Sequence, residues 1–128
     1  MDIVTRKQLN ILIQLAQADK HFSEKERELI YNLARKKNFP TEGVRELIRE
    51  PEPIGSFGAL SSNQRFDYLY NCIDLMLIDK KIFDSELLFC HNIAIKLDFK
   101  KSVVEYLKDH IHDMEYDDLR KIVMREYS

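Results

Sequence analysis

Two short stretches that repeat each other decide the fold: AQADKHFSEKE at residues 16–26 and MLIDKKIFDSE at residues 76–86. In each stretch an apolar segment with helical spacing ends at an Asp. An apolar residue follows three positions after the Asp, and a Glu follows seven positions after it. The two aspartates, Asp19 and Asp79, are 79 − 19 = 60 positions apart. This pattern predicts a helix, a short loop and a second helix, present twice in the chain.

The same offset of 60 relates twelve identical pairs, without a gap, between residues 9–48 and residues 69–108. Most of these pairs are apolar helix positions, which two amphipathic helices share partly by chance. The pairs in the loops are less easily explained in that way. We therefore predict two pseudo-symmetric three-helix repeats, repeat one at about 5–48 and repeat two at about 63–112, packed together through their apolar faces.

Helical spacing of apolar residues continues through nearly the whole chain and predicts an all-α bundle of about seven helices in a single domain, 1–128. We expect the helices at 3–18, 23–38, 41–49, 62–78, 84–98, 100–112 and 114–126, the last docking as a C-terminal cap. Capping boxes mark three helix starts, at Thr5 with Gln8, Ser23 with Glu26, and Ser61 with Gln64.

A linker at residues 49–62 separates the repeats. It holds two of the three prolines and two of the three glycines, so it cannot continue a helix. Ile54, Phe57 and Leu60 lie among its turn-forming residues. We expect them to pack over the core; the alternative is an apolar patch left open for a partner.

The composition bounds the class of protein. Of 128 residues 45% are hydrophobic and 33% charged, which is typical of a helical globular domain. The net charge of −2, with both signs interspersed, gives no sign of a nucleic-acid partner. No secretory signal and no membrane-spanning stretch is recognisable, so we expect no direct membrane insertion and a cytoplasmic location.

The cysteine, histidine, serine and glycine residues show no pattern typical of a catalytic site. Cys72 and Cys90 align with apolar positions of the first repeat and are expected to be buried free thiols. The four histidines, the serines and the three glycines form no metal, triad or phosphate-loop pattern, so we expect a protein that is not an enzyme. The basic clusters RKK at 35–37 and DFKKS at 98–102 are expected to be solvated helix ends.

The candidate metal ligands are the repeated acids of the two loops, Asp19, Glu26, Asp79 and Glu86. A divalent cation such as Ca²⁺ takes six to eight oxygen ligands, and these loops lack the alternating acids and Gly of an EF-hand. Capping by Ser23 explains Glu26 without a metal. In the second loop Phe83 replaces that Ser, so capping alone does not explain Glu86, although Asp84 offers another N-cap. Cation binding and structural capping both stay open.

The residues LIQLAQADKHFSEKERELIYNLARKKNF (12–39) and IDLMLIDKKIFDSELLFCHNIAIKLDF (73–99) resemble the tellurite-resistance TerB family. They are also similar to the related TerB-like domain of membrane-anchored DnaJ-type co-chaperones. The resemblance covers roughly residues 5 to 112. It implies an all-α fold of two pseudo-symmetric halves and a role in bacterial stress responses, including resistance to tellurite. It also implies metal binding through the acidic loop residues, which fall here on the four acids named above.

One position departs from the family pattern. The family commonly has Gly directly after the Asp, where this chain has Lys20 and Lys80. A Lys in the left-handed conformation that closes a helix costs about 1 kcal/mol, and its ammonium group lies close to the candidate cation site.

Two hypotheses about function follow. In the first, the chain is a binding or stress-response module that holds a divalent cation at its duplicated acidic loops. In the second, it is an adaptor that uses a helical groove or the linker surface to bind another protein, with no metal site. Neither hypothesis specifies an oligomeric state.

Overall fold

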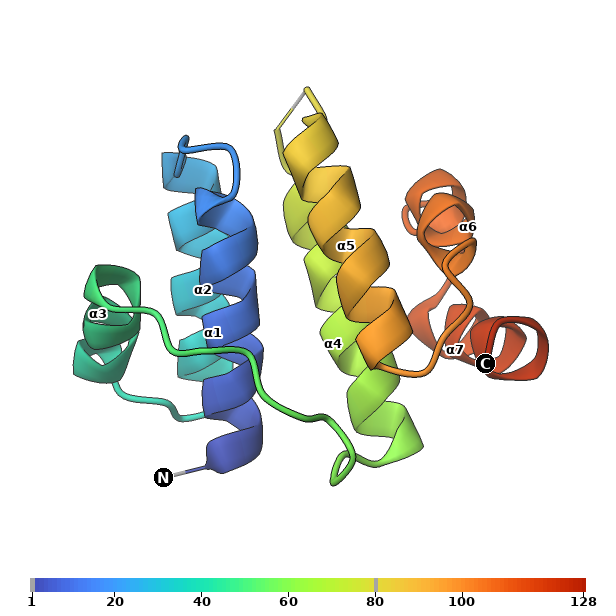
Figure 1. The fold of residues 1–128 in the computed structure, drawn as a ribbon, viewed down its shortest axis with the longest axis horizontal. Coiled ribbons are helices and arrows are strands. Elements are labelled where there is room, and N and C mark those ends of the chain that lie inside the picture. Colours follow the sequence, from blue (N-terminus) through green and yellow to red (C-terminus); the bar gives the residue numbers. More distant parts are fainter. Residues whose placement is uncertain (1, 80) are drawn as a thin grey trace.

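The computed structural model describes residues 2–79 and 81–128, and over these residues it contains helices and no strand. The helices are α1 (Ile3–Gln17), α2 (Glu24–Lys36), α3 (Thr41–Arg49), α4 (Ser62–Met76), α5 (Asp84–Lys96), α6 (Val103–His110) and α7 (Tyr116–Glu126) (Figure 1). The predicted all-α fold is confirmed. None of the described helices is both long and apolar enough to cross a bilayer. Lys80, the repeat partner of Lys20, lies outside the described residues.

The expected helix bounds agree with the observed ones within two residues, except at the start of α6. That helix begins at Val103 rather than at 100. The Lys100 N–H donates to the carbonyl oxygen of Tyr127 at 2.6 Å, which ties this part of the chain to the end of α7. The residues before Val103 form a turn instead of a helical extension.

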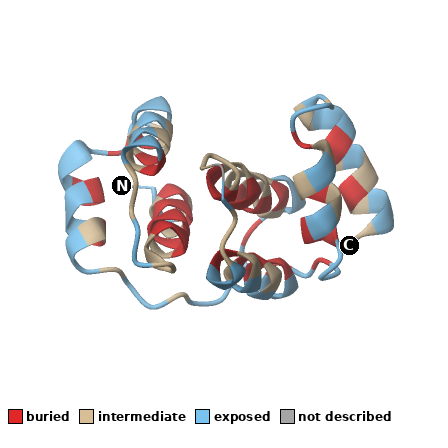
Figure 2. Ribbon diagram, turned by 90° about the horizontal axis from the view of Figure 1, so that it is seen from above, coloured by how far each residue is buried: buried red, intermediate tan, exposed pale blue. Residues whose placement is uncertain are grey.

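The helices form two groups with a shared centre. α1 packs with α2 and α3, α4 packs with α5 and α6, and the two groups meet where α1 lies along α4 (Figure 1). α5 also contacts α1, and α7 packs on α4 and α6 as the expected cap. Buried residues line the inward faces of the helices, and exposed residues line the outer faces (Figure 2).

The core is one cluster that includes residues of every helix, with α1 and α4 at its centre. Three of the identical repeat pairs on these two helices are fully buried: Leu9 with Leu69, Ile13 with Ile73, and Leu15 with Leu75. Burial of each such side chain contributes roughly 1.5–3 kcal/mol. The repeated apolar positions therefore hold the two halves together.

The second helix of each repeat ends in the same way. Asn38 and Asp98, which are related by the offset of 60, adopt left-handed backbone conformations with φ of 58° and 67°. The next residue in each case, Phe39 or Phe99, donates its N–H to the carbonyl of the Ala five positions earlier, at 2.8 and 2.9 Å. This is the Schellman arrangement, in which a buried apolar residue follows the left-handed one. Both Phe side chains are buried, so each motif turns the chain back toward the core.

The linker packs against α1, as expected. The Asn10 side chain donates to the Glu52 carbonyl at 2.9 Å and accepts the Glu52 N–H at 2.9 Å, which fixes the backbone of the linker. Phe57 and Leu60 are buried in the core, and Ile54 packs against it while partly exposed. The linker surface therefore offers little apolar area to a partner.

A polar network around Asp67 joins four helical segments. The Asp67 carboxylate on α4 accepts from Gln8 Nε2 of α1 at 3.0 Å. It also accepts from Lys37 Nζ, just beyond α2, at 3.0 Å, and from the Tyr116 hydroxyl of α7 at 2.9 Å. Burial raises the pKa of Asp67, but these hydrogen bonds and the charge of Lys37 outweigh it, so the pKa lies below its usual value.

Two sequence-based expectations are wrong at this network. Lys37, in the RKK cluster, is not a solvated helix end, because its ammonium group binds Asp67 and Gln8. The expected capping box of Thr5 with Gln8 does not form, because α1 begins earlier. Asp2 is the N-cap of α1, and its carboxylate accepts from the Thr5 hydroxyl at 2.6 Å.

We predict that Asp67→Asn lowers the free energy of unfolding by about 2 kcal/mol at pH 7, because the hydrogen bonds lose their charge and Lys37 loses its counter-ion. Since folding lowers the pKa of Asp67, its stabilisation is present above the usual value of 3.8 and is lost as the pH falls below it. Urea unfolding followed by circular dichroism at pH 7 and pH 3 measures both effects. The matched control is Asp113→Asn at an exposed carboxylate. Equal effects of the two substitutions at pH 7 would contradict the network.

Candidate functional site

The two acidic loops lie at the same end of the molecule. α1 and α4 run in the same direction, so the α1–α2 loop and the α4–α5 loop follow their C-terminal ends (Figure 1). The Ser23 hydroxyl of the first loop donates to Asp79 Oδ1 of the second at 3.4 Å. The four candidate acids are close enough for the charges of Asp19, Glu26 and Asp79 to act on Glu86. The structure thus brings the predicted residues together.

Glu26 is held in the predicted capping box. Its Oε1 accepts the Ser23 N–H at 2.8 Å, and its own N–H donates to Ser23 Oγ at 3.2 Å. Only 1% of its surface is exposed. Burial is the main cause that raises its pKa above the usual value, and the charges of Asp79 and Asp19 add to it. Glu26 therefore has a structural role whether or not a cation binds.

Glu86 occupies the matching position without a complete capping box. The N-cap of α5 is Phe83, whose N–H donates to Glu86 Oε1 at 3.1 Å but whose side chain has no oxygen to return the bond. Asp84, the alternative N-cap, is instead the first residue of the helix. Burial is the largest cause that raises the pKa of Glu86 to about 7, and the charges of Asp19, Glu26 and Asp79 add to it.

Asp19 closes its own loop. Its Oδ1 accepts the N–H of His21 at 2.9 Å rather than an N–H of α2. The intervening Lys20 has a φ of 63°, the left-handed conformation that the Gly of the family pattern would adopt without strain. The Lys stands there at a cost of about 1 kcal/mol.

The acidic loops form a negative cluster rather than a chelating site. Across residues 2–79 and 81–128, no three His, Cys, Asp or Glu side chains are arranged to hold a metal ion. Glu26, Glu86 and Asp19 each use an oxygen on a backbone N–H. Binding a cation through these same oxygens would require the carboxylates to give up their backbone hydrogen bonds. The predicted metal ligation stays a prediction.

The two cysteines are buried and free, as predicted. Burial raises the pKa of Cys72 to about 12 and that of Cys90 well above its usual value. Both are therefore protonated thiols that pack as apolar side chains.

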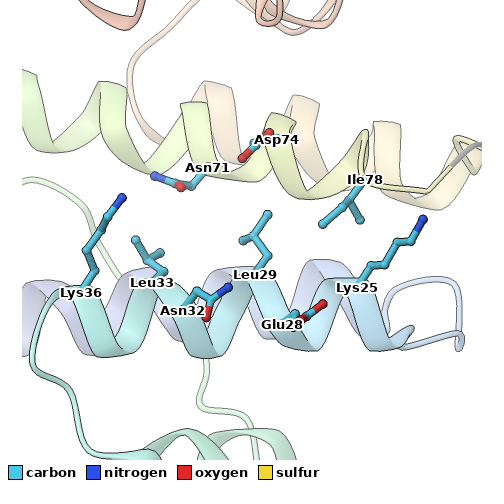
Figure 3. Close-up of a pocket in the computed structure, with 9 residues that line it drawn as sticks. All are labelled: Lys25, Glu28, Leu29, Asn32, Leu33, Lys36, Asn71, Asp74 and Ile78. Atoms are coloured by element: carbon cyan, nitrogen blue, oxygen red, sulfur yellow. The ribbon is translucent and has the colours of Figure 1, made fainter.

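A groove between α2 and α4, with a volume of about 400 Å³, is a concave feature that the sequence did not reveal (Figure 3). Leu29, Leu33 and Ile78 point into the space between the two helices. The remaining lining residues are Lys25, Glu28, Asn32 and Lys36 of α2 and Asn71 and Asp74 of α4. The groove thus has an apolar centre and a polar rim.

This groove exists because the two repeats pack unequally. α5 of the second repeat contacts α1, whereas in the described chain α2 makes no comparable contact with α4. At the positions of Leu29 and Leu33, α5 carries Phe89 and Ile93, and Ile93 is 2% exposed while Leu33 stays partly exposed. In sequence these pairs are conservative. The sequence alone therefore gives little indication of this difference in packing.

One carboxylate of the rim is electrostatically distinctive. Burial raises the pKa of Asp74, and the nearby His112 acts in the opposite direction. Asp74 lies on the α4 wall, across the groove from the lysines of α2 (Figure 3). The two walls therefore carry opposite charges at these positions.

Comparison with known proteins gives no match to a family model, a curated protein or a solved structure. The TerB resemblance therefore rests on the repeated loop residues alone.

We predict that Glu86→Gln stabilises the protein at pH 8 by about 3 kcal/mol, at 1.36 kcal/mol per pKa unit, while keeping an oxygen for the Phe83 N–H. Because folding raises the pKa of Glu86, the wild-type chain loses stability as the pH rises from 4.5 to about 7. The difference should be near zero below pH 4.5. Urea unfolding at several pH values measures it, with Glu50→Gln at an exposed carboxylate as control. A difference that does not change with pH would show that Glu86 is ionised at no cost.

Proposed function

We propose that the chain is a non-enzymatic, cytoplasmic binding module of the TerB-like type, and that its α2–α4 groove holds a helical segment of another protein. The observation that carries this proposal is the groove itself, which leaves an apolar strip open between two helices. A part in a stress response is the role that the TerB resemblance implies.

The lining supports an amphipathic helix as the occupant. Leu29 and Leu33 are four residues apart and lie on one face of α2, and Ile78 faces them from the other wall (Figure 3). A helix that lays apolar residues into such a strip is a common mode of peptide recognition. The strip is bordered on both sides by polar side chains, which would fix the register of the partner.

The charged residues of the lining indicate which charged side chains the partner helix should carry. Lys25 and Lys36 stand at the two ends of the α2 wall, eleven residues or about 16 Å apart. They favour a partner with carboxylates near both ends of its apolar stripe. Asp74 on the opposite wall favours a basic residue between them.

We predict that Leu33→Glu reduces capture of the partner at least tenfold, because a carboxylate in the apolar strip opposes burial of the partner's side chains. The immobilised chain is incubated with lysate of its source cells, and captured proteins are quantified by mass spectrometry. A synthetic helix with leucines at i, i+4 and i+7 and glutamates at both ends should compete, and the same helix with lysines at its ends should not.

Lys121→Glu at an exposed position of α7 is the control for nonspecific capture, and circular dichroism confirms that Leu33→Glu remains folded. Capture that is unaffected by Leu33→Glu would place the binding surface elsewhere. Failure of the wild-type chain to retain any protein would contradict the adaptor role.

Cation binding at the acidic loops is a second candidate function. The observation that favours it is the convergence of four carboxylates from both repeats, two of them buried, at one end of the bundle. A divalent cation would compete with the proton on Glu86 and offset the repulsion among the four acids. Movement of the carboxylates from their present hydrogen bonds opposes it.

For this candidate we predict that Ca²⁺ or Mn²⁺ raises the melting temperature more at pH 8 than at pH 5, because protons compete for the same oxygens. Calorimetry should show heat of binding and proton release. Asp19→Asn combined with Asp79→Asn should remove both effects, and Asp113→Asn should not. Absence of heat together with an unchanged melting temperature would exclude the cation role.

A further inference from the structure

We propose that the outer face of α5 binds a second copy of this chain. α5 lies at the front of the bundle in Figure 1. Leu88 and Ile95, seven residues apart and therefore on the same side of the helix, are 61% and 54% exposed. The remaining exposed large hydrophobic residue of the described chain is Ile3, at the start of α1.

The first repeat provides an internal comparison. At the positions that match Leu88 and Ile95, α2 carries Glu28 and Arg35, both exposed. The second helix of a repeat thus folds with charged residues at these two places. The fold does not require the aliphatic side chains of α5, and these two, on the same side of the helix, are accessible to a partner surface.

The charges along this face favour a second copy in antiparallel orientation. Asp84, Leu88, Asn92 and Lys96 follow one another at intervals of four, so they form a single ridge, and all four are exposed. The ridge is acidic at its N-terminal end and basic at its C-terminal end. An identical ridge turned by 180° brings each Asp84 to the Lys96 of the other copy, whereas a parallel pairing brings like charges together.

The apolar residues meet at the centre of such a pair. A two-fold axis near the middle of α5 brings Leu88 and Ile95 of both copies into one cluster of four aliphatic side chains. Asn92 lies beside this cluster and offers its amide to the other copy. The contact is isologous, which is the commonest arrangement of homodimers.

The area buried in the interface sets the expected affinity of the dimer. Packing of one helix of this length against another buries less than the roughly 1,200 Å² of a stable interface. We therefore expect a reversible dimer with a dissociation constant on the order of 100 μM.

Sedimentation velocity of the full chain, from about 10 μM to about 1 mM, spans this constant and tests the proposal. The expected result is a concentration-dependent shift from monomer to dimer. Leu88→Glu combined with Ile95→Arg, the residues of the first repeat, should weaken association at least tenfold. Ile3→Glu, at an equally exposed aliphatic residue away from α5, should leave it unchanged.

A charge exchange tests the orientation. Asp84→Lys and Lys96→Asp should each weaken association, and the two together should restore it, because the exchanged charges again pair across the axis. Circular dichroism of each variant confirms that α5 remains helical. A monomer at every concentration would overturn the proposal, and so would a dimer insensitive to the Leu88 and Ile95 substitutions. Leu33→Glu in the groove should not affect association, so the two surfaces are tested separately.

Discussion

The position of one carboxylate, Asp67, sets the arrangement of the bundle. The Asp67 carboxylate is partly buried, with 29% of its side chain exposed, and its donors come from α1, from the end of α2 and from α7. The helix that carries Asp67 can make all of these hydrogen bonds only where the three segments meet. Apolar packing along α1 and α4 supplies most of the attraction between the halves. The hydrogen-bond network around Asp67 constrains the register of the two helices more strongly, because few geometries satisfy all of its members.

With α1 and α4 held in this register, the other features of the molecule follow. Both loops that leave these helices emerge at one end, so the acids of the two repeats converge there. α5 comes against α1, while α2 remains at a distance from α4 and leaves the groove. The groove and the acidic cluster are thus consequences of the same placement of two parallel helices.

Local features of the fold could be predicted from the sequence, and features that join distant segments could not. The seven helices of the described chain and the capping boxes at Ser23 and Ser61 depend on residues within a few positions of one another. Asp67 aligns with Lys7 in the repeat, so the duplication gives no signal for its role. Lys37 resembles a solvated helix end until α4 is placed beside it. For the same reason the four acids could be named in advance, while their convergence and the groove could not.

The linker, which Asn10 holds against α1, shows why the two sequence repeats are not two independent folding units. The duplication suggests a boundary near residue 48, yet Glu52 of the linker is hydrogen-bonded to Asn10 of α1, and Phe57 and Leu60 contribute to the common core. A first half cut at that boundary would lose its covering segment and the carboxylate that holds Gln8 and Lys37. The second half would lose the helix against which α4 and α5 pack. The unit that repeats in the sequence is therefore smaller than the unit that folds, and each half has its apolar face covered only by the other.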